Sequence, residues 1–229
     1  MRTAMDSPSK PRRRPAAGIA KRAFDIAVSA VLLVALAPLL IVIALAVGST
    51  SPGGPLFRQV RVGREGRPFR IAKFRSMAVT EGSEAGSFEP GSSARVTAVG
   101  RVLRRTKLDE LPQLWNVLCG EMSLVGPRPE VPRWTQVHAD RWRDVLSVRP
   151  GITDPASLEF RHEEALLAAS SDPEATYRDE ILPRKLELAE RYVREQSLWG
   201  DLNILVGTAI AIFRRPRSAA TLVDSGACS

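Results

Sequence analysis

An apolar run from Ile26 to Val47 constrains the fold of this chain more than any other feature of its sequence. Ser29 is the only polar residue in the run, and Pro38 lies in its middle. A straight helix of this length would extend roughly 33 Å, enough to cross a bilayer. Proline removes a backbone hydrogen bond and clashes with the preceding turn, so we expect a kink at Pro38. Neither half of the run is long enough to cross a membrane alone.

Basic residues flank the apolar run on both sides. Those before it are Arg2, Lys10, Arg12, Arg13, Arg14, Lys21 and Arg22, and those after it are Arg58, Arg61, Arg64, Arg67, Arg70, Lys73 and Arg75. Basic residues favour the cytoplasmic side of a membrane, so both ends of the run should lie on that side. We therefore expect a re-entrant membrane helix that is broken at Pro38 and leaves the membrane by the face it entered. A plain transmembrane anchor is the alternative.

The charge balance of the chain points to anionic partners. Its 229 residues include 33 Lys+Arg and 25 Asp+Glu, which gives a formal net charge of +8. Such an excess suits nucleic acid, phosphorylated substrates or an anionic membrane surface. The aromatic residues are too sparse to form stacking platforms, so we expect no nucleic-acid partner. Residues 1–20 have no apolar period and predict a disordered basic arm near anionic lipid headgroups.

After the apolar run the sequence predicts a small β-hairpin. Two strand-like segments, Leu56–Val62 and Arg67–Arg75, flank a turn at Gly63–Gly66. A period of two places four side chains of the second strand on one face, namely Phe69, Ile71, Lys73 and Arg75. The basic members of this face either are solvated or form an electropositive wall that faces a phosphate. Residues 80–93 are rich in Gly, Ser and Glu and predict a mobile loop.

Most of the remaining chain has helical periodicity. The expected helical segments are 99–117 with a break near Asp109, 130–147, 163–170, and 175–196 split at Pro183. Between them, Gly126–Pro129 should form a stiff extended loop and Arg149–Thr153 a turn. A last apolar segment, Leu198–Phe213, should be a helix that either packs on the domain or lies in the membrane interface.

The densest cluster of chemically active side chains lies between Leu103 and Asn116. Asp109 and Glu110 are adjacent there and have three basic neighbours, Arg104, Arg105 and Lys107. Pro112 suits the first turn of a helix, which would put Asp109 near the N-cap, where free N–H groups favour anions and lower a carboxylate's pKa. A carboxylate in that place can bind Mg²⁺ or attack phosphorus. By spacing alone, a plain N-cap Asp followed by a solvated Glu is an equally good interpretation.

Arg128 offers a second candidate contact for phosphate. The prolines on either side of it fix the backbone and present one planar, permanently charged guanidinium, which suits bidentate phosphate binding. A rigid surface loop with a solvated arginine is the alternative. The sequence contains no zinc-ligand spacing, no G-x-S-x-G, no P-loop and no G-x-G-x-x-G.

Together these segments resemble the bacterial sugar transferases, specifically the small monotopic polyprenyl-phosphate phosphoglycosyl transferases. The matching stretches, in family order, are Lys21–Asp25, Pro52–Gly63, Lys73–Met77, Leu103–Leu118, Gly120–Pro129 and Arg149–Thr153. Two strings are highly specific: Asp-Glu-Leu-Pro-Gln-Leu-Trp-Asn, which begins at Asp109, and Ser-Leu-Val-Gly-Pro-Arg-Pro, which begins at Ser123.

The resemblance implies an enzyme that moves a phosphosugar from a UDP-sugar to a polyprenyl phosphate such as undecaprenyl phosphate, with Mg²⁺ as cofactor. The product would be the first lipid-linked intermediate of a surface glycan. The enzyme would sit on the cytoplasmic face of the bacterial inner membrane in contact with lipids, and a homodimer is left open. The implied fold is α+β and mostly helical, with a re-entrant membrane helix, a small hairpin and a cytosolic catalytic domain with interfacial amphipathic helices.

The resemblance also implies roles for individual residues. Asp109 would be the nucleophile that carries the phosphosugar covalently and releases UMP. Glu110 would help to bind the metal, together with Asp109, or would act as a base toward the lipid phosphate. The basic residues implied to hold phosphates are Lys73, Arg75, Arg104 and Arg128. The family's helix-breaking dipeptide falls on Ala37-Pro38.

The implied organisation has five parts: a basic arm over 1–20, the re-entrant helix over 21–50, the catalytic domain over 51–200, an apolar C-terminal helix over 201–215 and a disordered tail over 216–229. The chain departs from the family after Thr153, where many members continue with Gly and this chain has Asp154-Pro155. Recognition of the sugar ring is therefore left open. Two alternative hypotheses for the function are a non-catalytic basic scaffold at the membrane and a metal-dependent phosphodiesterase that uses water as acceptor.

Overall fold

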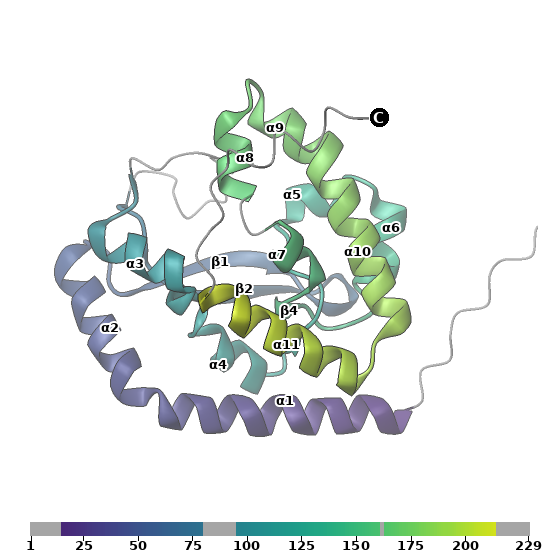
Figure 1. Cartoon of the computed structure of the whole chain (residues 1–229), viewed down its shortest axis with the longest axis horizontal. Coiled ribbons are helices and arrows are strands. Elements are labelled where there is room, and N and C mark those ends of the chain that lie inside the picture. The colour runs from purple at the N-terminus through teal and green to yellow at the C-terminus, as the bar shows by residue number, and fades with distance from the viewer. Residues whose placement is uncertain (1–14, 80–94, 161–162, 214–229) are drawn as a thin grey trace, which may run out of the picture.

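The computed structural model describes residues 15–79, 95–160 and 163–213. Most of the sequence predicted as a basic arm, a loop and a tail, residues 1–14, 80–93 and 216–229, lies outside these ranges. The described part is mostly helical with a small antiparallel hairpin, as predicted. In Figure 1 the first helix runs along one edge of the molecule, and the hairpin lies in the interior between the helices.

The apolar run forms two helices, α1 (Pro15–Ala35) and α2 (Ala37–Thr50), which are bent by 65° at Leu36. Pro38 lies in the first turn of α2, where its missing N–H leaves no helical bond unmade. The predicted break near Pro38 is therefore confirmed. The helix begins at Pro15, so residues 15–20 are helical and not part of the arm, a correction to the predicted boundary. No single helix in the described ranges is long and apolar enough to cross a membrane.

Large apolar side chains on this helix pair face outward. Val34 is 78% exposed and Leu45 is 69% exposed, whereas Ile43 and Val47 are buried against Phe74. Such a contiguous apolar surface is unusual on a protein that meets only water. The helix pair thus has one face that packs on the rest of the chain and one that does not.

The hairpin consists of β1 (Leu56–Val62) and β2 (Pro68–Phe74), paired antiparallel so that Leu56 faces Phe74. The chain reverses through a 3₁₀ turn at Arg64–Gly66 with a positive φ of 59° at Glu65. The predicted strands are confirmed except at two ends, because Arg67 and Arg75 lie outside β2. Phe69 and Ile71 are buried on one face, as the period of two predicts.

The predicted break near Asp109 is confirmed. Helix α3 (Ala98–Thr106) ends at Lys107, whose φ of 58° takes the chain out of the helix. A 3₁₀ turn, η3 (Leu108–Glu110), follows, and then α4 (Gln113–Leu118), whose N-cap is Pro112. Asp109 therefore lies near the start of α4, as expected, but not at its N-cap. Asp109 lies in the turn before α4, because Pro112 takes the capping position itself.

A second, two-stranded sheet was not predicted. β3 (Ser123–Val125) and β4 (Gly151–Thr153) pair in parallel, although the sequence suggested only a turn at 149–153. Three residues are too few to show a period. The two strands bring Gly126 against Gly151, and a side-chain Cβ on Gly126 would lie 2.5 Å from Arg149 O. Only glycine allows this approach.

The rest of the described chain is helical. Its elements are α5 (Pro132–Thr135), α6 (Ala139–Val145), α7 (Pro155–Glu159), α8 (Glu163–Ala169), α9 (Pro173–Thr176), the π-helical turn η4 (Tyr177–Ile181), α10 (Leu182–Glu195) and α11 (Leu198–Phe213). The predicted single helix over 130–147 is instead two short helices, because His138 has a φ of 58°. Pro183 lies in the first turn of α10, at the predicted split.

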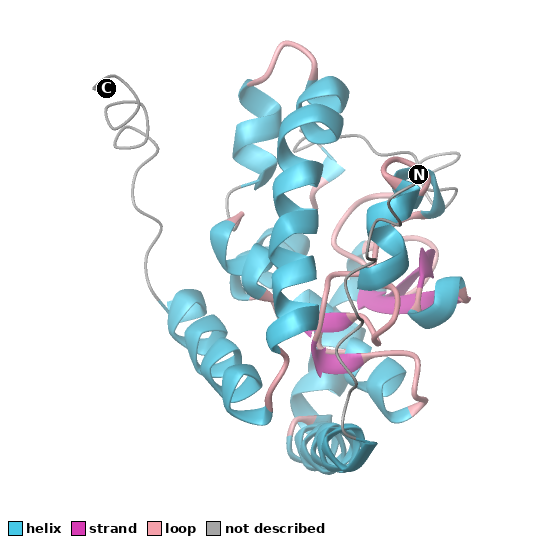
Figure 2. Cartoon of the chain, turned by 90° about the vertical axis from the view of Figure 1, so that its right-hand side faces the viewer, coloured by secondary structure: helices cyan, strands magenta, loops and turns pink. Residues whose placement is uncertain are grey.

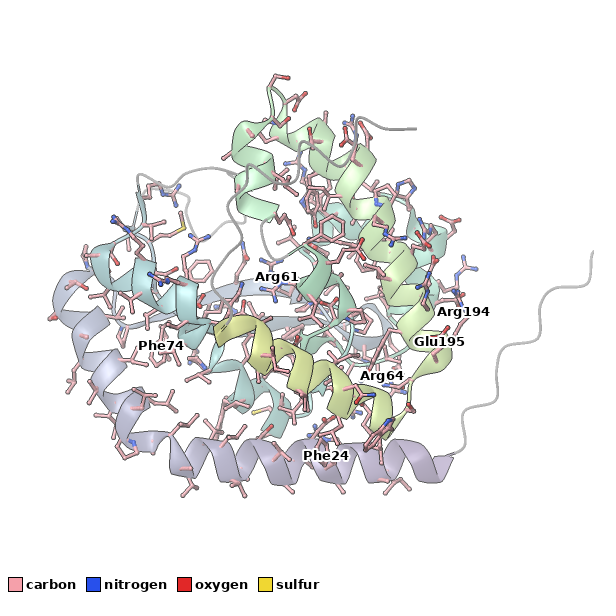
Figure 3. All side chains as sticks on the ribbon, in the orientation of Figure 1. Phe24, Arg61, Arg64, Phe74, Arg194 and Glu195 are labelled. Carbon is pink, nitrogen blue, oxygen red and sulfur yellow. The ribbon has the colours of Figure 1, made fainter. Side chains whose placement is uncertain are left out.

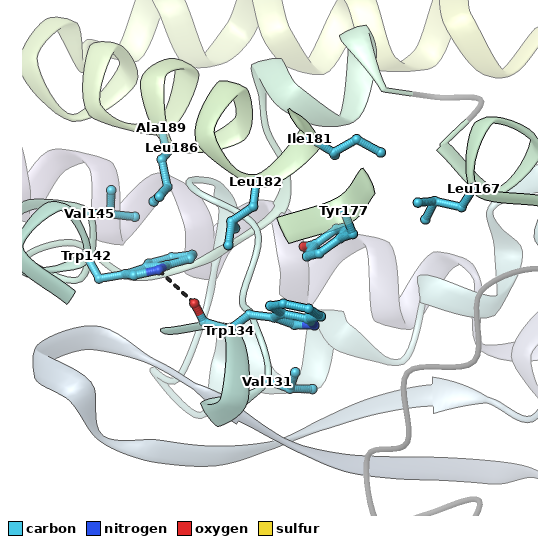
Figure 4. Packing of buried hydrophobic residues seen from close by; sticks show 10 residues of the cluster. All are labelled: Val131, Trp134, Trp142, Val145, Leu167, Tyr177, Ile181, Leu182, Leu186 and Ala189. Carbon is cyan, nitrogen blue, oxygen red and sulfur yellow. Dashed lines mark hydrogen bonds between the residues drawn. The ribbon is translucent and has the colours of Figure 1, made fainter. Parts of the chain in front are cut away.

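The largest buried cluster joins α5, α6 and α10 (Figure 4). Trp142 Nε1 donates a hydrogen bond of 3.1 Å to Trp134 O, and the rings of Trp134 and Tyr177 lie 4.9 Å apart. Helix α11 stands at the margin of the domain in Figure 2, away from this cluster. Its residues Ile204 and Leu205 pack inward, while Trp199 is 71% exposed, so it is partly packed and partly uncovered.

Asn116 fastens α4 to the edge of β2. Its Oδ1 accepts from Ala72 N at 3.0 Å, and its Nδ2 donates to Arg70 O at 2.9 Å and to Glu121 Oε2 at 2.7 Å. The amide thus continues the edge of the hairpin as a further strand would. This contact fixes the segment that carries Asp109 and Glu110 to the strand that carries Lys73.

Asn116→Ala should lower the free energy of unfolding by about 2–4 kcal/mol, because it leaves the buried donor Ala72 N and the partly buried acceptor Arg70 O of β2 without this partner. Asn203→Ala, on an exposed position of α11, should change it by less than about 0.5 kcal/mol. Thermal unfolding of both variants in detergent measures the difference. Equal midpoints for the two variants would contradict the assigned role of Asn116.

Candidate active site

Asp109 and Glu110 lie at the meeting point of three segments that are distant in sequence. Both residues are 8% exposed. Glu110 Oε1 accepts from Lys73 Nζ of β2 at 3.0 Å and from Arg128 Nη2 of the 126–129 loop at 2.6 Å. The structure therefore brings four of the predicted site residues together. The charge-assisted contacts on one oxygen fix the geometry of Glu110 closely.

The two cations control the ionisation of Glu110. Burial alone would raise the pKa of its carboxyl, but the attraction of Arg128 and Lys73 holds the pKa well below its usual value. The pKa of Lys73 is lowered, because the cost of burying its ammonium exceeds the attraction of Glu110. The pKa of Arg128 is raised, mainly by Glu110. Glu110 is thus a fully ionised anchor for two cations.

Asp109 lies beside this ion cluster and is bound quite differently. Among the described residues, its buried Oδ1 has no hydrogen-bond partner. Burial raises the pKa of its carboxyl, and Lys73 offsets part of that rise. The expectation that a helix N-terminus lowers the pKa of Asp109 is therefore wrong, because desolvation dominates. The neighbouring carboxylates differ in that Glu110 is held by cations while Asp109 has an unused oxygen.

The first helix supports the segment that carries this carboxylate pair. Helix α4 packs against α1. Arg22 of α1 donates to Leu118 O at 3.3 Å and to Met122 O at 3.5 Å, so its guanidinium caps the C-terminal end of α4. The distance between the carboxylates and the apolar helix is therefore set by direct packing.

The other two predicted phosphate contacts differ in their placement. Arg104 is half-buried near Asp109. Burial lowers the pKa of the Arg104 guanidinium, and the negative charge of Asp109 offsets part of that lowering. Arg75 is buried, and its guanidinium donates to Gly53 O at 3.1 Å, Gly54 O at 3.0 Å and Leu56 O at 3.1 Å. Arg75 thus fixes the segment that joins α2 to β1.

Arg61 is a basic residue next to the site that the sequence did not single out as functional. It lies on β1, near the centre of the molecule in Figure 3, and donates to Pro129 O at 3.2 Å and to Gln59 Oε1 at 2.6 Å. Its guanidinium is 3.7 Å from Glu130. Burial lowers its pKa, and the positive charge of Arg128 adds to that effect. Alternation along β1 could have placed Phe57, Gln59 and Arg61 on the inward face.

The donor set fits a magnesium ion that arrives with a phosphorylated ligand. No group of three or more metal-binding side chains occurs in the described ranges. Proteins that use Mg²⁺ with phosphates commonly supply only one or two carboxylates, and the substrate and water supply the rest. Asp109, whose Oδ1 has no partner among the described residues, has the less occupied carboxylate of the pair. Glu110 Oε1 is already bound by two cations.

Comparison with known proteins gives consistent matches over most of the chain. A family model described as bacterial sugar transferase matches residues 16–215. The UDP-glucose:undecaprenyl-phosphate glucose-1-phosphate transferase of Klebsiella pneumoniae is 39% identical over 84% of this chain and 40% of its own length. The protein of the same name from Caulobacter vibrioides is 38% identical over 88% of this chain and 72% of its own length. The undecaprenyl-phosphate galactose phosphotransferase of Salmonella typhimurium is 35% identical, over 85% of this chain and 40% of its own. The chain thus spans well under half of the Klebsiella and Salmonella proteins.

Glu110→Gln should lower the stability at neutral pH by about 3–5 kcal/mol, because it leaves Lys73 and Arg128 buried without their anion. Because the pKa of Glu110 is lower in the folded than in the unfolded protein, its ionised carboxyl stabilises the fold at every pH above the unfolded pKa of 4.5. This stabilisation is lost as the pH falls from 4.5 through the folded-state pKa. The difference between wild type and Glu110→Gln should therefore be constant from about pH 7 to pH 5 and shrink below pH 4.5. Thermal unfolding across that range measures it, and a pH-independent difference would disprove the ionised anchor.

Proposed function

The chain belongs to the bacterial sugar transferase family, and we propose that it transfers a phosphosugar from a UDP-sugar to a polyprenyl phosphate. The observation that carries this proposal is the carboxylate pair, in which buried Asp109 has an unused oxygen while Glu110 holds two cations. Relatives named as transferases that act with undecaprenyl phosphate support the same reaction class. The transfer would begin the assembly of a surface glycan.

In the first step, a carboxylate oxygen of Asp109 attacks the phosphorus that bears the sugar. A bond forms between that oxygen and phosphorus, and the bond from phosphorus to the bridging oxygen of the diphosphate breaks. UMP leaves with the bridging oxygen and its electron pair, and the sugar phosphate stays on Asp109 as an acyl phosphate. Lys73 and Arg128, which both contact Glu110, would neutralise the charge that develops on the phosphoryl oxygens.

In the second step, a phosphate oxygen of the polyprenyl phosphate attacks the same phosphorus. The acyl phosphate bond breaks, which restores the Asp109 carboxylate and releases a polyprenyl diphosphate sugar. Because the two half-reactions use one site in turn, a soluble donor and a lipid acceptor need never be bound together. The low pKa of Glu110 makes it a weak base, so we assign it the task of holding Lys73 and Arg128 in place.

Magnesium would be held by Asp109 together with the donor's phosphates, and Glu110 would contribute its less occupied oxygen. When bound, the ion supplies charge neutralisation for the diphosphate. The chain's own cations remain responsible for orientation. Arg104, near Asp109, is the further basic residue that we assign to substrate phosphate, whereas Arg75 serves the fold through its three backbone contacts.

The helix pair α1–α2 would enter the cytoplasmic leaflet of the inner membrane and return to the same side. Helix α2 has 14 residues and so extends only about 21 Å, which is less than the roughly 30 Å of a hydrocarbon core. The outward apolar side chains of both helices would contact lipid, and the exposed side chains of α11 would lie at the interface. Because α4 packs on α1, this topology would put Asp109 near the depth of a lipid phosphate.

Asp109→Asn should reduce UMP release from UDP-sugars by at least about 1,000-fold, because an amide oxygen cannot act as the attacking carboxylate. A screen of UDP-sugars with and without undecaprenyl phosphate measures it. Wild-type protein mixed with donor alone should release about one UMP per molecule and carry a phosphosugar adduct on the peptide that contains Asp109. Asp144→Asn, at an exposed position on α6, is the matched control and should behave as wild type.

Several outcomes of that screen would contradict the proposal. Near-normal release by Asp109→Asn would remove the nucleophile assignment. Continuous release without any lipid acceptor would indicate a phosphodiesterase that uses water. No release with any UDP-sugar, with or without lipid, would favour a non-catalytic membrane scaffold.

Pro38→Ala should straighten the helix pair. Alanine supplies the backbone N–H that a continuous helix needs at this position, and it lacks the ring that clashes with the preceding turn. A continuous helix would be long enough to cross, so one end should move to the other side of the membrane. Labelling of single cysteines at Gly18 and Arg67 with an impermeant reagent, in a background without Cys119 and Cys228, measures the topology. Both sites should label from the cytoplasm in wild type and from opposite sides in Pro38→Ala.

Pro52→Ala is the matched control for Pro38→Ala, because Pro52 lies after the end of α2 and outside the bend. It should leave the labelling pattern of wild type unchanged. Opposite-side labelling in the wild type itself would show a plain transmembrane anchor and would rule out the re-entrant form.

A further inference from the structure

We propose that Asp154 is a positioning residue that holds Arg128 in place for the reaction; this inference rests on the proposed function of the site. Asp154 is only 2% exposed, and its two carboxylate oxygens have different partners. Oδ1 accepts from Ser157 N at 2.7 Å and so caps α7. Oδ2 accepts from Arg128 N at 3.1 Å. One buried side chain thus connects the start of a helix to the backbone of the arginine that binds Glu110.

The chemistry of the loop makes this contact unusually important. Arg128 stands between Pro127 and Pro129, and proline has no backbone N–H. The amide of Arg128 is therefore the only main-chain donor that these three residues can offer. Asp154 accepts from that donor with a charged oxygen, which makes a stronger hydrogen bond than a neutral acceptor would.

Two backbone hydrogen bonds already hold the part of the loop that precedes Arg128. Gly126 N donates to Thr153 O at 3.1 Å, and Gly151 N donates to Pro127 O at 3.0 Å. These bonds place the start of the loop against the strand β4. The contact from Asp154 fixes the residue whose guanidinium lies 2.6 Å from Glu110. Its negative charge also adds to the field that keeps Arg128 protonated.

Asp154 stands directly after β4 and directly before Pro155. The Asp-Pro pair begins α7 with a side-chain cap and a proline in the first turn. A residue without a side-chain acceptor at this position, such as glycine, could make neither of the two hydrogen bonds.

A second Asp-Pro pair separates the capping role from the positioning role. Asp172 precedes Pro173 in the same way, and its Oδ1 accepts from Ala175 N at 3.0 Å at the start of α9. Its side chain is exposed, unlike that of Asp154. Asp172→Ser is therefore the matched control for Asp154→Ser. Serine can cap a helix nearly as well as aspartate, but its single short hydroxyl cannot also reach the amide of Arg128.

The first measurement is a double-mutant cycle between Asp154 and Arg128. Asp154→Ser should lower kcat/KM for UMP release by roughly 10- to 100-fold, the range for losing a hydrogen bond to a charged group. In an Arg128→Ala background the same change should have almost no effect, because the residue it positions is gone. Asp172→Ser should leave kcat/KM unchanged in both backgrounds. Equal losses in the two backgrounds would mean that Asp154 acts only through the fold, and would overturn the inference.

The second measurement does not depend on activity. Because the flanking prolines have no amide hydrogen, deuterium uptake across residues 127–129 reports the Arg128 amide alone. Asp154→Ser should accelerate that uptake while the retained cap keeps the Ser157 amide protected. Unchanged uptake at Arg128 would overturn the inference even in an active enzyme. Absence of UMP release from wild type would instead remove the proposed function, and the exchange result would still decide whether Asp154 holds Arg128.

Discussion

A buried carboxylate, Glu110, joins the three segments of the site by binding two cations through one oxygen. Glu110 can remain ionised at 8% exposure only because Lys73 and Arg128 approach it together. Those cations belong to the hairpin and to the 126–129 loop, so both segments must be in place before the charge can be buried. Folding of the site and folding of the domain are therefore coupled through a single side chain.

The same arrangement fixes the site relative to the first helix. Asn116 ties α4 to β2, and Arg22 of α1 caps the other end of α4. Arg75 closes the framework, because its guanidinium binds three carbonyls in the segment that connects α2 to β1. Each of these polar side chains satisfies backbone groups that regular secondary structure leaves unpaired. The position of the carboxylates thus follows from how irregular segments are hydrogen-bonded.

The sequence allowed some of this to be predicted and concealed the rest. A proline in an apolar run and an alternating strand are local signals, so the break at Leu36 and the hairpin were predictable. Contacts between distant segments leave no such signal. Alternation put Arg75 on the face of Lys73, but β2 ends at Phe74 and carbonyls bind the arginine instead. The raised pKa of Asp109 depends on burial, which spacing along the chain cannot reveal.

The contrast between the two carboxylates also bears on the division of labour in the site. Two neighbouring acids with pKa values displaced in opposite directions are suited to different tasks. Glu110, stabilised by two cations, is a poor nucleophile and a good anchor. Asp109 lacks such stabilisation at Oδ1 and its pKa is raised by burial, so it is the more basic of the two and suits the proposed role of nucleophile. In the proposed reaction, desolvation of Asp109 would therefore assist attack, because Lys73 and Arg128 are bound to Glu110 and offset only part of the rise in the pKa of Asp109.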